Sequence, residues 1–252
     1  MSASELRRDA AFDRWGELGS SPELSAAVLA MLGERLGPLE PARSTALNEV
    51  TLPSAEPIPP PVVAAAGGEA CASTSDEDRV RHAAGSGYPD LIRLRGGHLE
   101  AAPDAVLAPA DAAAVAATLE ACAAERIAVV PFGGGTSVVG GVEPLRDGFR
   151  ALVSLDLAAL RAVDVDPVSL SARLGPGLRG PEAEAALGQA GFTLGHFPQS
   201  YRYATIGGYA ATRSAGQASS GYGRFDALVN GVELATPVGR LATATTPHSA
   251  AG

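Results

Sequence analysis

The sequence contains no lysine, so arginine supplies all 19 of its basic side chains. A Walker-A phosphate loop and a Schiff-base enzyme both depend on lysine, and both are therefore excluded within these residues. The net charge of −9 and the lack of a basic cluster also argue against binding to a nucleic-acid backbone. A phosphate group would have to be held here by main-chain amides or by arginine.

Cysteine and histidine are scarce and scattered. The two cysteines, Cys71 and Cys122, form no CxxC pair, and the four histidines show no metal-ligand spacing. We therefore predict no metal site and expect two reduced structural thiols.

Long hydrophobic runs are also missing. The longest one near the N-terminus, residues 24–32, is too short to span a bilayer, and no signal peptide or lipidation motif precedes or follows it. We expect a cytoplasmic protein with no integral membrane segment.

Aromatic residues make up only 5% of the chain, whereas glycine occurs 30 times and proline 19 times. Small side chains and main chain must therefore do much of the packing, and many residues must lie in turns. With 252 residues and 46% hydrophobic content, the chain can still bury a sizeable core, as one large domain or two small ones.

Residues 1–70 are predicted to form an N-terminal extension. Ser21 can cap a helix that has Pro22 at its first position, and Leu24, Val28 and Leu32 recur at helical spacing. The proline-rich residues 53–68 predict an extended or flexible connection. Residues 71–100 are assigned to a lead-in segment.

A regular pattern begins near residue 103 and continues to the end. It predicts strands at residues 105–108, 127–132, 151–155, 169–174 and 228–235, and helices at residues 111–124 and 181–191. Residues 237–240 predict a hairpin turn. Residues 243–252 are loop-like, and we expect from this ending that the chain is truncated.

The first candidate site follows the strand at residues 127–132. Three successive glycines, Gly133 to Gly135, can adopt positive φ and direct several main-chain N–H groups toward one point. Such a nest binds an anionic oxygen without a positive side chain, and Thr136 and Ser137 add hydroxyl donors. A tight glycine turn between strands is the alternative. The run does not match GxGxxG, so a nicotinamide site is not supported.

Two further stretches could contribute. In residues 198–216, Thr205 can cap a short helix entered through a glycine pair, and Arg213 could bind a phosphate or a carboxylate. In residues 219–226, Tyr222 could line a flat aromatic ligand. A surface loop and a packed tyrosine are the alternatives. His196 is predicted to be a hydrogen-bonded structural residue.

These segments together resemble the FAD-binding domain of the vanillyl-alcohol-oxidase and p-cresol-methylhydroxylase (PCMH) type. The order is strand–helix–strand, PFGGGTSVVGG, further strands, TIGG with ATRSAG, and YGRFDALV. The segments HFPQSYRYATIGGYAATRSAGQ, DEDRVRHAAG, NEVTLP and FDRWG resemble the alkyldihydroxyacetonephosphate synthases (alkylglycerone-phosphate synthases). The resemblance implies an α+β, PCMH-type FAD-binding fold with two α+β subdomains. The second subdomain would be incomplete, a helical N-terminal segment would precede the fold, and residues 101–252 would form the FAD-binding domain.

The resemblance also implies which residues contact FAD. The glycine-rich segment would cradle the diphosphate, and the two later segments would pass along the flavin and ribityl side. Carried over to this sequence, the cofactor-binding residues are Pro131, Phe132, Gly133, Gly134, Gly135, Thr136, Ser137, Val138, Gln199, Ser200, Tyr201, Arg202, Tyr203, Ala204, Thr205, Thr212, Arg213, Ser214 and Ala215.

The sequence departs from the family pattern in two places. Many relatives attach flavin covalently through a histidine just after the glycine run, and this neighbourhood holds Thr136 and Ser137 instead, so we predict non-covalent FAD. The later E-G-x-L-G segment and the catalytic residues are absent, so catalysis is expected to use residues beyond 252. For the same reason residues 1–252 alone are expected to bind FAD weakly.

Three functions follow from the resemblance. The first is an ether-lipid synthase, a transferase that exchanges the acyl group of acyl-dihydroxyacetone phosphate for a fatty alcohol without net redox change. The second is an FAD-dependent oxidoreductase of a 2-hydroxy acid or alcohol. The third is a truncated, inactive flavin-binding fragment. The expected partner is a small-molecule or lipid-like substrate, and a homodimer stays an open alternative.

Overall fold

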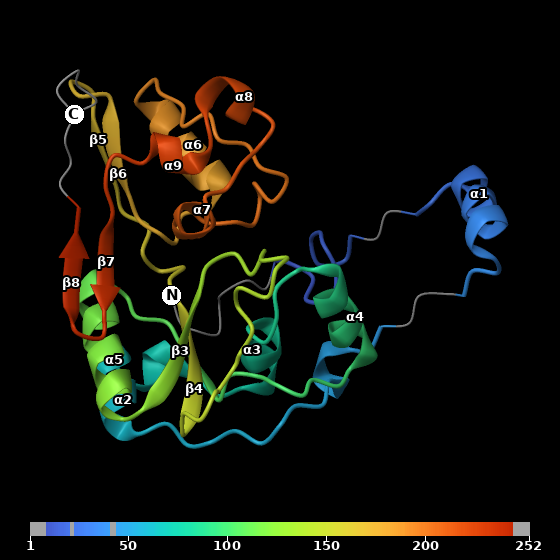
Figure 1. The fold of residues 1–252 in the computed structure, drawn as a ribbon, viewed down its shortest axis with the longest axis horizontal. Coiled ribbons are helices and arrows are strands. Elements are labelled where there is room, and N and C mark those ends of the chain that lie inside the picture. The colour runs from blue at the N-terminus through green and yellow to red at the C-terminus, as the bar shows by residue number, and fades with distance from the viewer. Residues whose placement is uncertain (1–8, 21–22, 41–43, 244–252) are drawn as a thin grey trace.

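The computed structural model describes residues 9–20, 23–40 and 44–243. Its helices and strands form two lobes, drawn one above the other in Figure 1, and residues 9–18 contact both of them. The lower lobe is built around the main sheet, and the upper lobe contains most of the residues after 160. This mixed arrangement is the α+β fold that the sequence predicts.

The main sheet has four strands in the order β1-β2-β4-β3. These are β1 (Ala72–Ser73), β2 (Ala105–Leu107), β3 (Ile127–Phe132) and β4 (Ala151–Asp156). β2 and β3 both run parallel to β4, whereas β1 is antiparallel to β2. Every residue of β4 is buried, as expected for a central parallel strand covered on both faces.

Helices cover both faces of this sheet (Figure 1). One side carries α2 (Pro60–Ala66) and α5 (Ala112–Ala124), and the other carries α3 (Asp76–Arg81) and, farther out, α4 (Tyr88–Gly96). Asp111 caps α5 by accepting a 2.8 Å hydrogen bond from the Ala114 amide, as its position in the sequence predicts.

The prediction that residues 53–68 form an extended or flexible connection is wrong over α2, which is a helix. The prolines there occupy the first turn of the helix, where a missing N–H costs no hydrogen bond. Val62 and Ala66 then pack in the same buried cluster as Leu107, Val115 and other residues of the sheet and α5. The apolar run that follows the prolines is therefore part of the core.

The upper lobe has a smaller core of its own, formed by residues such as Leu178, Ala183, Ile206 and Tyr209. Its elements are β5 (Val163–Asp166), β6 (Ser171–Leu174), α6 (Gly180–Gln189), α7 (Ile206–Thr212), α8 (Ser219–Tyr222) and α9 (Phe225–Leu228). β5 and β6 form an antiparallel pair. The sequence analysis missed β5, and the predicted strand at 228–235 is wrong at its start, because α9 ends there.

The hairpin of β7 (Glu233–Thr236) and β8 (Gly239–Ala242) returns to the lower lobe beside α5. Its turn, Pro237 and Val238, lies where the sequence predicts it. Ala235 packs against the core cluster of the main sheet. The hairpin therefore ties the end of the described chain to the first lobe.

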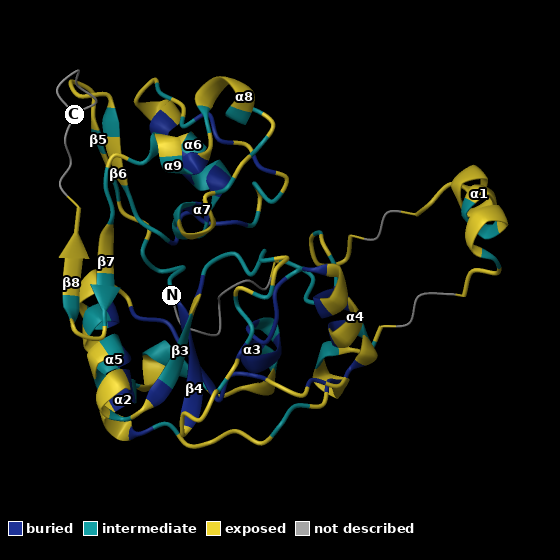
Figure 2. Cartoon of the chain, viewed as in Figure 1, coloured by how far each residue is buried: buried dark blue, intermediate teal, exposed yellow. Residues whose placement is uncertain are grey.

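The N-terminal part contains α1 (Ala26–Leu36), η2 (Leu47–Glu49) and, after α2, η3 (Glu69–Cys71). α1 stands apart from both lobes and is largely exposed (Figures 1 and 2). The cap of α1 is Ser25, not the predicted Ser21. Ser21 and Pro22 lie outside the described residues, as do residues 244–252. No described helix is long and apolar enough to cross a bilayer.

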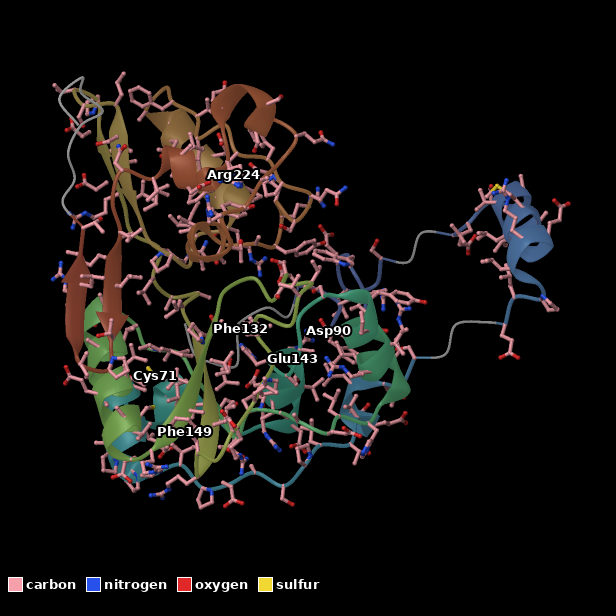
Figure 3. All side chains as sticks on the ribbon, in the orientation of Figure 1. Cys71, Asp90, Phe132, Glu143, Phe149 and Arg224 are labelled. Atoms are coloured by element: carbon pink, nitrogen blue, oxygen red, sulfur yellow. The ribbon has the colours of Figure 1, made fainter. Side chains whose placement is uncertain are left out.

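Both cysteines are free thiols near the main sheet, but they differ in exposure. Cys122 is buried on α5, and burial raises the pKa of its thiol to about 11. Cys71, labelled in Figure 3, is half-buried. Since the thiolate is the nucleophile, Cys122 should be unreactive at neutral pH.

We predict that a thiol-specific reagent at pH 8 modifies Cys71 first and Cys122 only after unfolding. Mass spectrometry of the digested protein at successive times would assign the two sites. Modification of both cysteines at the same rate in the folded protein would show that the packing around α5 is looser than described.

Candidate cofactor site

The glycine loop (residues 133–137) leaves the end of β3 and begins the crossover to the parallel strand β4. Phe132, labelled in Figure 3, is the last residue of β3 and is buried. Its ring packs on His82 from α3's end, with ring centroids 4.5 Å apart. The loop therefore starts from a rigid base and is not the bend of a plain hairpin.

His82 and Asp156 form a fully buried pair beneath this base. His82 Nδ1 lies 2.8 Å from the Asp78 carbonyl oxygen, which can only accept, so Nδ1 carries a hydrogen. His82 Nε2 lies 2.9 Å from Asp156 Oδ2. Both ring nitrogens of His82 are therefore held by partners inside the core.

The two lobes meet where the glycine loop approaches the segment before α7. A Cβ atom on Gly134 would lie 2.3 Å from the Tyr203 carbonyl oxygen, and one on Gly133 would lie 2.4 Å from Thr205 Oγ1. Neither distance is tolerable, so both positions require glycine in this packing. The absence of Cβ atoms serves the contact between lobes as well as the approach of a ligand.

The glycine loop leaves main-chain donors free. Among the described residues, the N–H groups of Gly134, Gly135 and Thr136 have no hydrogen-bond acceptor. All three residues are half-buried, and Gly135 has a φ of 65°, in the left-handed region. Half-buried amides without a partner are costly unless a ligand or water satisfies them, and left-handed residues are a feature of anion-binding nests.

A second segment, which contains Gly85 and Ser86, also contacts the glycine loop. The Ser86 amide donates to the Ser137 carbonyl at 2.7 Å, and the Ser86 hydroxyl donates to the Gly135 carbonyl at 2.9 Å. A Cβ on Gly85 would lie 2.2 Å from the Ser137 carbonyl oxygen. Ser86 thus donates hydrogen bonds to two carbonyl groups of the glycine loop, those of Gly135 and Ser137. The amides of the loop are left for another partner.

A cavity of about 70 Å³ lies beside the glycine loop. This is the share of liquid occupied by two or three waters, so the cavity suits a small polar group and accounts for only part of a dinucleotide. The lower lobe contributes residues around Arg81, Ser86 and Gly134, and the upper lobe contributes Arg179 and Tyr203. The remaining wall comes from N-terminal residues, including Arg14 and Trp15.

These features fit the diphosphate of FAD. Unpaired amides supply donors, glycine leaves the main chain accessible, and arginine supplies positive charge without lysine. Binding of the diphosphate by the glycine loop, as the sequence analysis expects, stays a prediction that these features support.

The predicted residues 199–205 are brought to the same place only in part. Tyr203 lines the cavity, and Thr205 caps α7 by accepting from the Gly208 amide at 3.3 Å, as predicted. Tyr201 instead packs against Gly180, and the exposed Arg202 pairs with Glu17 at 3.0 Å. Contact of Gln199, Ser200 and Ala204 with the cofactor stays a prediction.

Residues 212–215 do not line the cavity beside the glycine loop. Arg213 ends α7 in a left-handed conformation and pairs with Asp226 at 2.8 Å, which lowers the pKa of that carboxyl group. Ser214 contacts His196, at 3.0 Å from its Nε2. The predicted role of Thr212, Arg213, Ser214 and Ala215 in binding the flavin therefore stays a prediction.

His196 is the hydrogen-bonded structural residue that the sequence predicts. It is buried, and its ring packs edge-on against Tyr209 and Phe225 with centroids 4.8 and 5.1 Å apart. Burial lowers its pKa, so the ring is neutral at pH 7.

Sequence reasoning missed several cavity residues: Arg14, Trp15, Gly85, Ser86 and Arg179. Trp15 is the only tryptophan of the chain, and residues 84–87 read Ala-Gly-Ser-Gly, so both places offered a signal. Their distance from the glycine loop in sequence hid their proximity in space.

Residues 103–245 match the protein family described as an FAD binding domain. The chain is 35% identical over 196 residues to alkyldihydroxyacetonephosphate synthase of Trypanosoma brucei brucei, covering 74% of this chain and 32% of the relative. The Dictyostelium discoideum synthase is 34% identical over 175 residues, covering 69% and 28%.

Among solved structures, an alkyldihydroxyacetonephosphate synthase superposes with a TM-score of 0.85 at 25% sequence identity. The match covers 94% of this chain and 50% of that one. The chain thus spans about a third of the length of the curated relatives it matches and half of the solved synthase.

We predict that Gly134→Val abolishes saturable FAD binding, because its side chain would collide with the Tyr203 main chain and move the loop amides. The control is Gly188→Ala on α6, where a Cβ meets nothing within 4 Å. Equilibrium titration of FAD with each protein, in its complete natural length, checks this. Equal FAD affinity of Gly134→Val and wild type would remove the glycine loop from the cofactor site.

Proposed function

The chain belongs to the FAD binding domain family, and from this premise we propose that it is the FAD-binding part of a flavoenzyme resembling alkyldihydroxyacetonephosphate synthase. The observation that carries the proposal is the position of three acceptor-free amides, Gly134 to Thr136, on a half-buried loop between two lobes. The match to the Trypanosoma synthase covers 74% of this chain, whereas a match of similar identity to an FAD-linked oxidoreductase covers 52%, and this extent supports the synthase over other flavoenzymes.

We propose that the residues of this chain act by binding and orienting the cofactor. The amides of the glycine loop donate to the diphosphate oxygens, and Arg179 offsets part of their charge. Tyr203 bounds the cavity from the upper lobe. When bound, FAD supplies the electron-accepting flavin ring on which the chemistry of such enzymes depends.

The organisation of the chain is part of the proposal. We assign residues 1–70 to an N-terminal extension, 71–100 to a lead-in segment and 101–252 to the FAD-binding domain. The family match over residues 103–245 supports the last assignment. α2 and β1 nevertheless pack in or beside the core of the same sheet, so the first two segments complete the lobe and are not independent of it.

For the whole enzyme we propose exchange of the acyl group of acyl-dihydroxyacetone phosphate for a fatty alcohol. An ester bond at the substrate carbon is broken and an ether bond formed, the fatty acid leaves, and no net redox change occurs. The substrate would then be lipid-like, and the enzyme would take part in ether lipid biosynthesis.

We predict that the protein, in its complete natural length, releases fatty acid from acyl-dihydroxyacetone phosphate when a fatty alcohol is present. Because the exchange is redox-neutral, the flavin should show no net reduction once the reaction is complete without oxygen. Stoichiometric ether product measured by mass spectrometry would support the exchange. Anaerobic bleaching of the flavin by a 2-hydroxy acid, with no ether product, would instead identify an oxidoreductase.

We also predict that FAD is held non-covalently, since residues 133–141 contain no histidine to attach it. Acid precipitation of the FAD-loaded protein should leave all flavin absorbance in the supernatant. Flavin that stays with the precipitated protein would contradict this and would require a covalent attachment at another residue.

A further inference from the structure

The N-terminal turn (residues 9–18) lies against the glycine loop although it is far away in sequence. Its two arms are joined by hydrogen bonds from the Ala11 amide to the Gly16 carbonyl at 3.0 Å and from the Leu18 amide to the Asp9 carbonyl at 2.9 Å. Phe12, Arg14, Trp15 and Gly16 line the cavity beside Gly134 to Thr136. The turn precedes residues 103–245, which match the FAD binding domain family.

The turn is attached to the lower lobe by several hydrogen bonds. Trp15 Nε1 donates to the Ser86 carbonyl at 3.2 Å, next to the glycine loop. Arg81 donates to the Ala10 carbonyl at 3.1 Å, and Arg95 donates to the Asp13 carbonyl at 3.0 Å. These contacts fix the main chain of the turn to α3, α4 and the segment that holds the loop carbonyls.

The turn contacts the upper lobe through two ion pairs and one aromatic contact. Asp9 forms a two-point ion pair with Arg179, at 2.5 and 3.2 Å, and this raises the pKa of the arginine. Glu17 pairs with Arg202 at 3.0 Å, and the Trp15 ring meets the edge of Tyr203 at a centroid distance of 6.2 Å. The same ten residues therefore bridge both lobes across the cavity.

From this arrangement we infer that the N-terminal turn is a wall of the cofactor site, which closes the cavity over the diphosphate of FAD, with Arg14 and Trp15 as cofactor-binding residues. Arg14, which also pairs with Asp13 at 2.9 Å, supplies guanidinium donors in a chain without lysine, and the Trp15 indole, 44% exposed, forms part of the cavity wall beside the loop. The bridging pairs hold this wall in place. The inference rests on the proposed function, because it takes FAD as the ligand.

The turn also explains how an acidic chain can hold a doubly charged diphosphate. Arg14, Arg81 and Arg179 all line the cavity, and their guanidinium groups also pair with Asp13, Glu77 and Asp9, which lie outside it. Removing one of these arginines leaves a diphosphate with fewer charge-assisted hydrogen bonds. Guanidinium donors at the site are therefore gathered from three separate parts of the chain.

The test is an equilibrium titration of FAD with wild type, Arg14→Gln, Trp15→Ala and Asp9→Asn, each in the protein's complete natural length. We expect the Kd of the first two variants to rise by about 10-fold or more, because each loses an interaction with a charged or desolvated group. Asp9→Asn lies outside the cavity and acts only by loosening the bridge to Arg179. It should raise the FAD dissociation rate in stopped-flow displacement.

Arg35→Gln is the matched control, since it removes the same charge from the exposed helix α1. Its Kd should stay within about twofold of wild type, as for a surface charge far from the ligand. Far-UV circular dichroism and the melting temperature without FAD show whether each variant folds. A variant that melts like wild type and binds FAD more weakly supports the inference.

The outcomes separate the inference from the proposed function. If wild type and Gly188→Ala bind FAD but the turn variants bind equally well or more tightly, the inference is overturned and the function stands. If no protein shows saturable FAD binding, the proposed function fails first. Loss of binding in Gly134→Val together with unchanged binding in Arg14→Gln and Trp15→Ala also overturns the role of the turn.

Discussion

The close approach of two main-chain segments governs this structure. Gly134 passes the Tyr203 carbonyl so closely that no side chain fits, and Gly133 does the same at the Thr205 hydroxyl. This contact joins the main sheet, which is mixed, to a second lobe with its own core. It also places Gly134 in the wall of the cavity between the lobes. The packing of the two lobes thus depends on these missing Cβ atoms.

The composition of the chain limits which groups can bind a negative charge at the site. The chain carries a net charge of −9 and has no lysine, so a phosphate group must be bound by amides and arginines. The Gly135 and Ser137 carbonyls of the loop accept hydrogen bonds from Ser86, which leaves the loop amides as donors. The buried His82–Asp156 pair lies beneath Phe132. The rigid base and the free amides are the features that support the predicted anion site.

Much of the fold could be predicted from the sequence, because local signals there are strong. The cap at Asp111, the strand at residues 127–132 and the turn at Pro237 lie where periodicity and turn residues place them. α2 could not be predicted, because three successive prolines resemble a linker until the buried Val62 is seen. The sequence also predicts the glycine loop as an anion site, and this stays a prediction. The contributions of Trp15, Ser86 and Arg179 were not, since their proximity depends on tertiary packing between distant segments.

The central claim is that the amides of Gly134, Gly135 and Thr136 bind the diphosphate of FAD. The most direct measurement is a ¹H–¹⁵N correlation spectrum of the protein during titration with FAD and, separately, with inorganic pyrophosphate. We predict that these three amide resonances move progressively with both ligands and saturate together, whereas the Gly188 resonance stays in place. FAD binding that leaves all three loop amides unmoved would contradict the account.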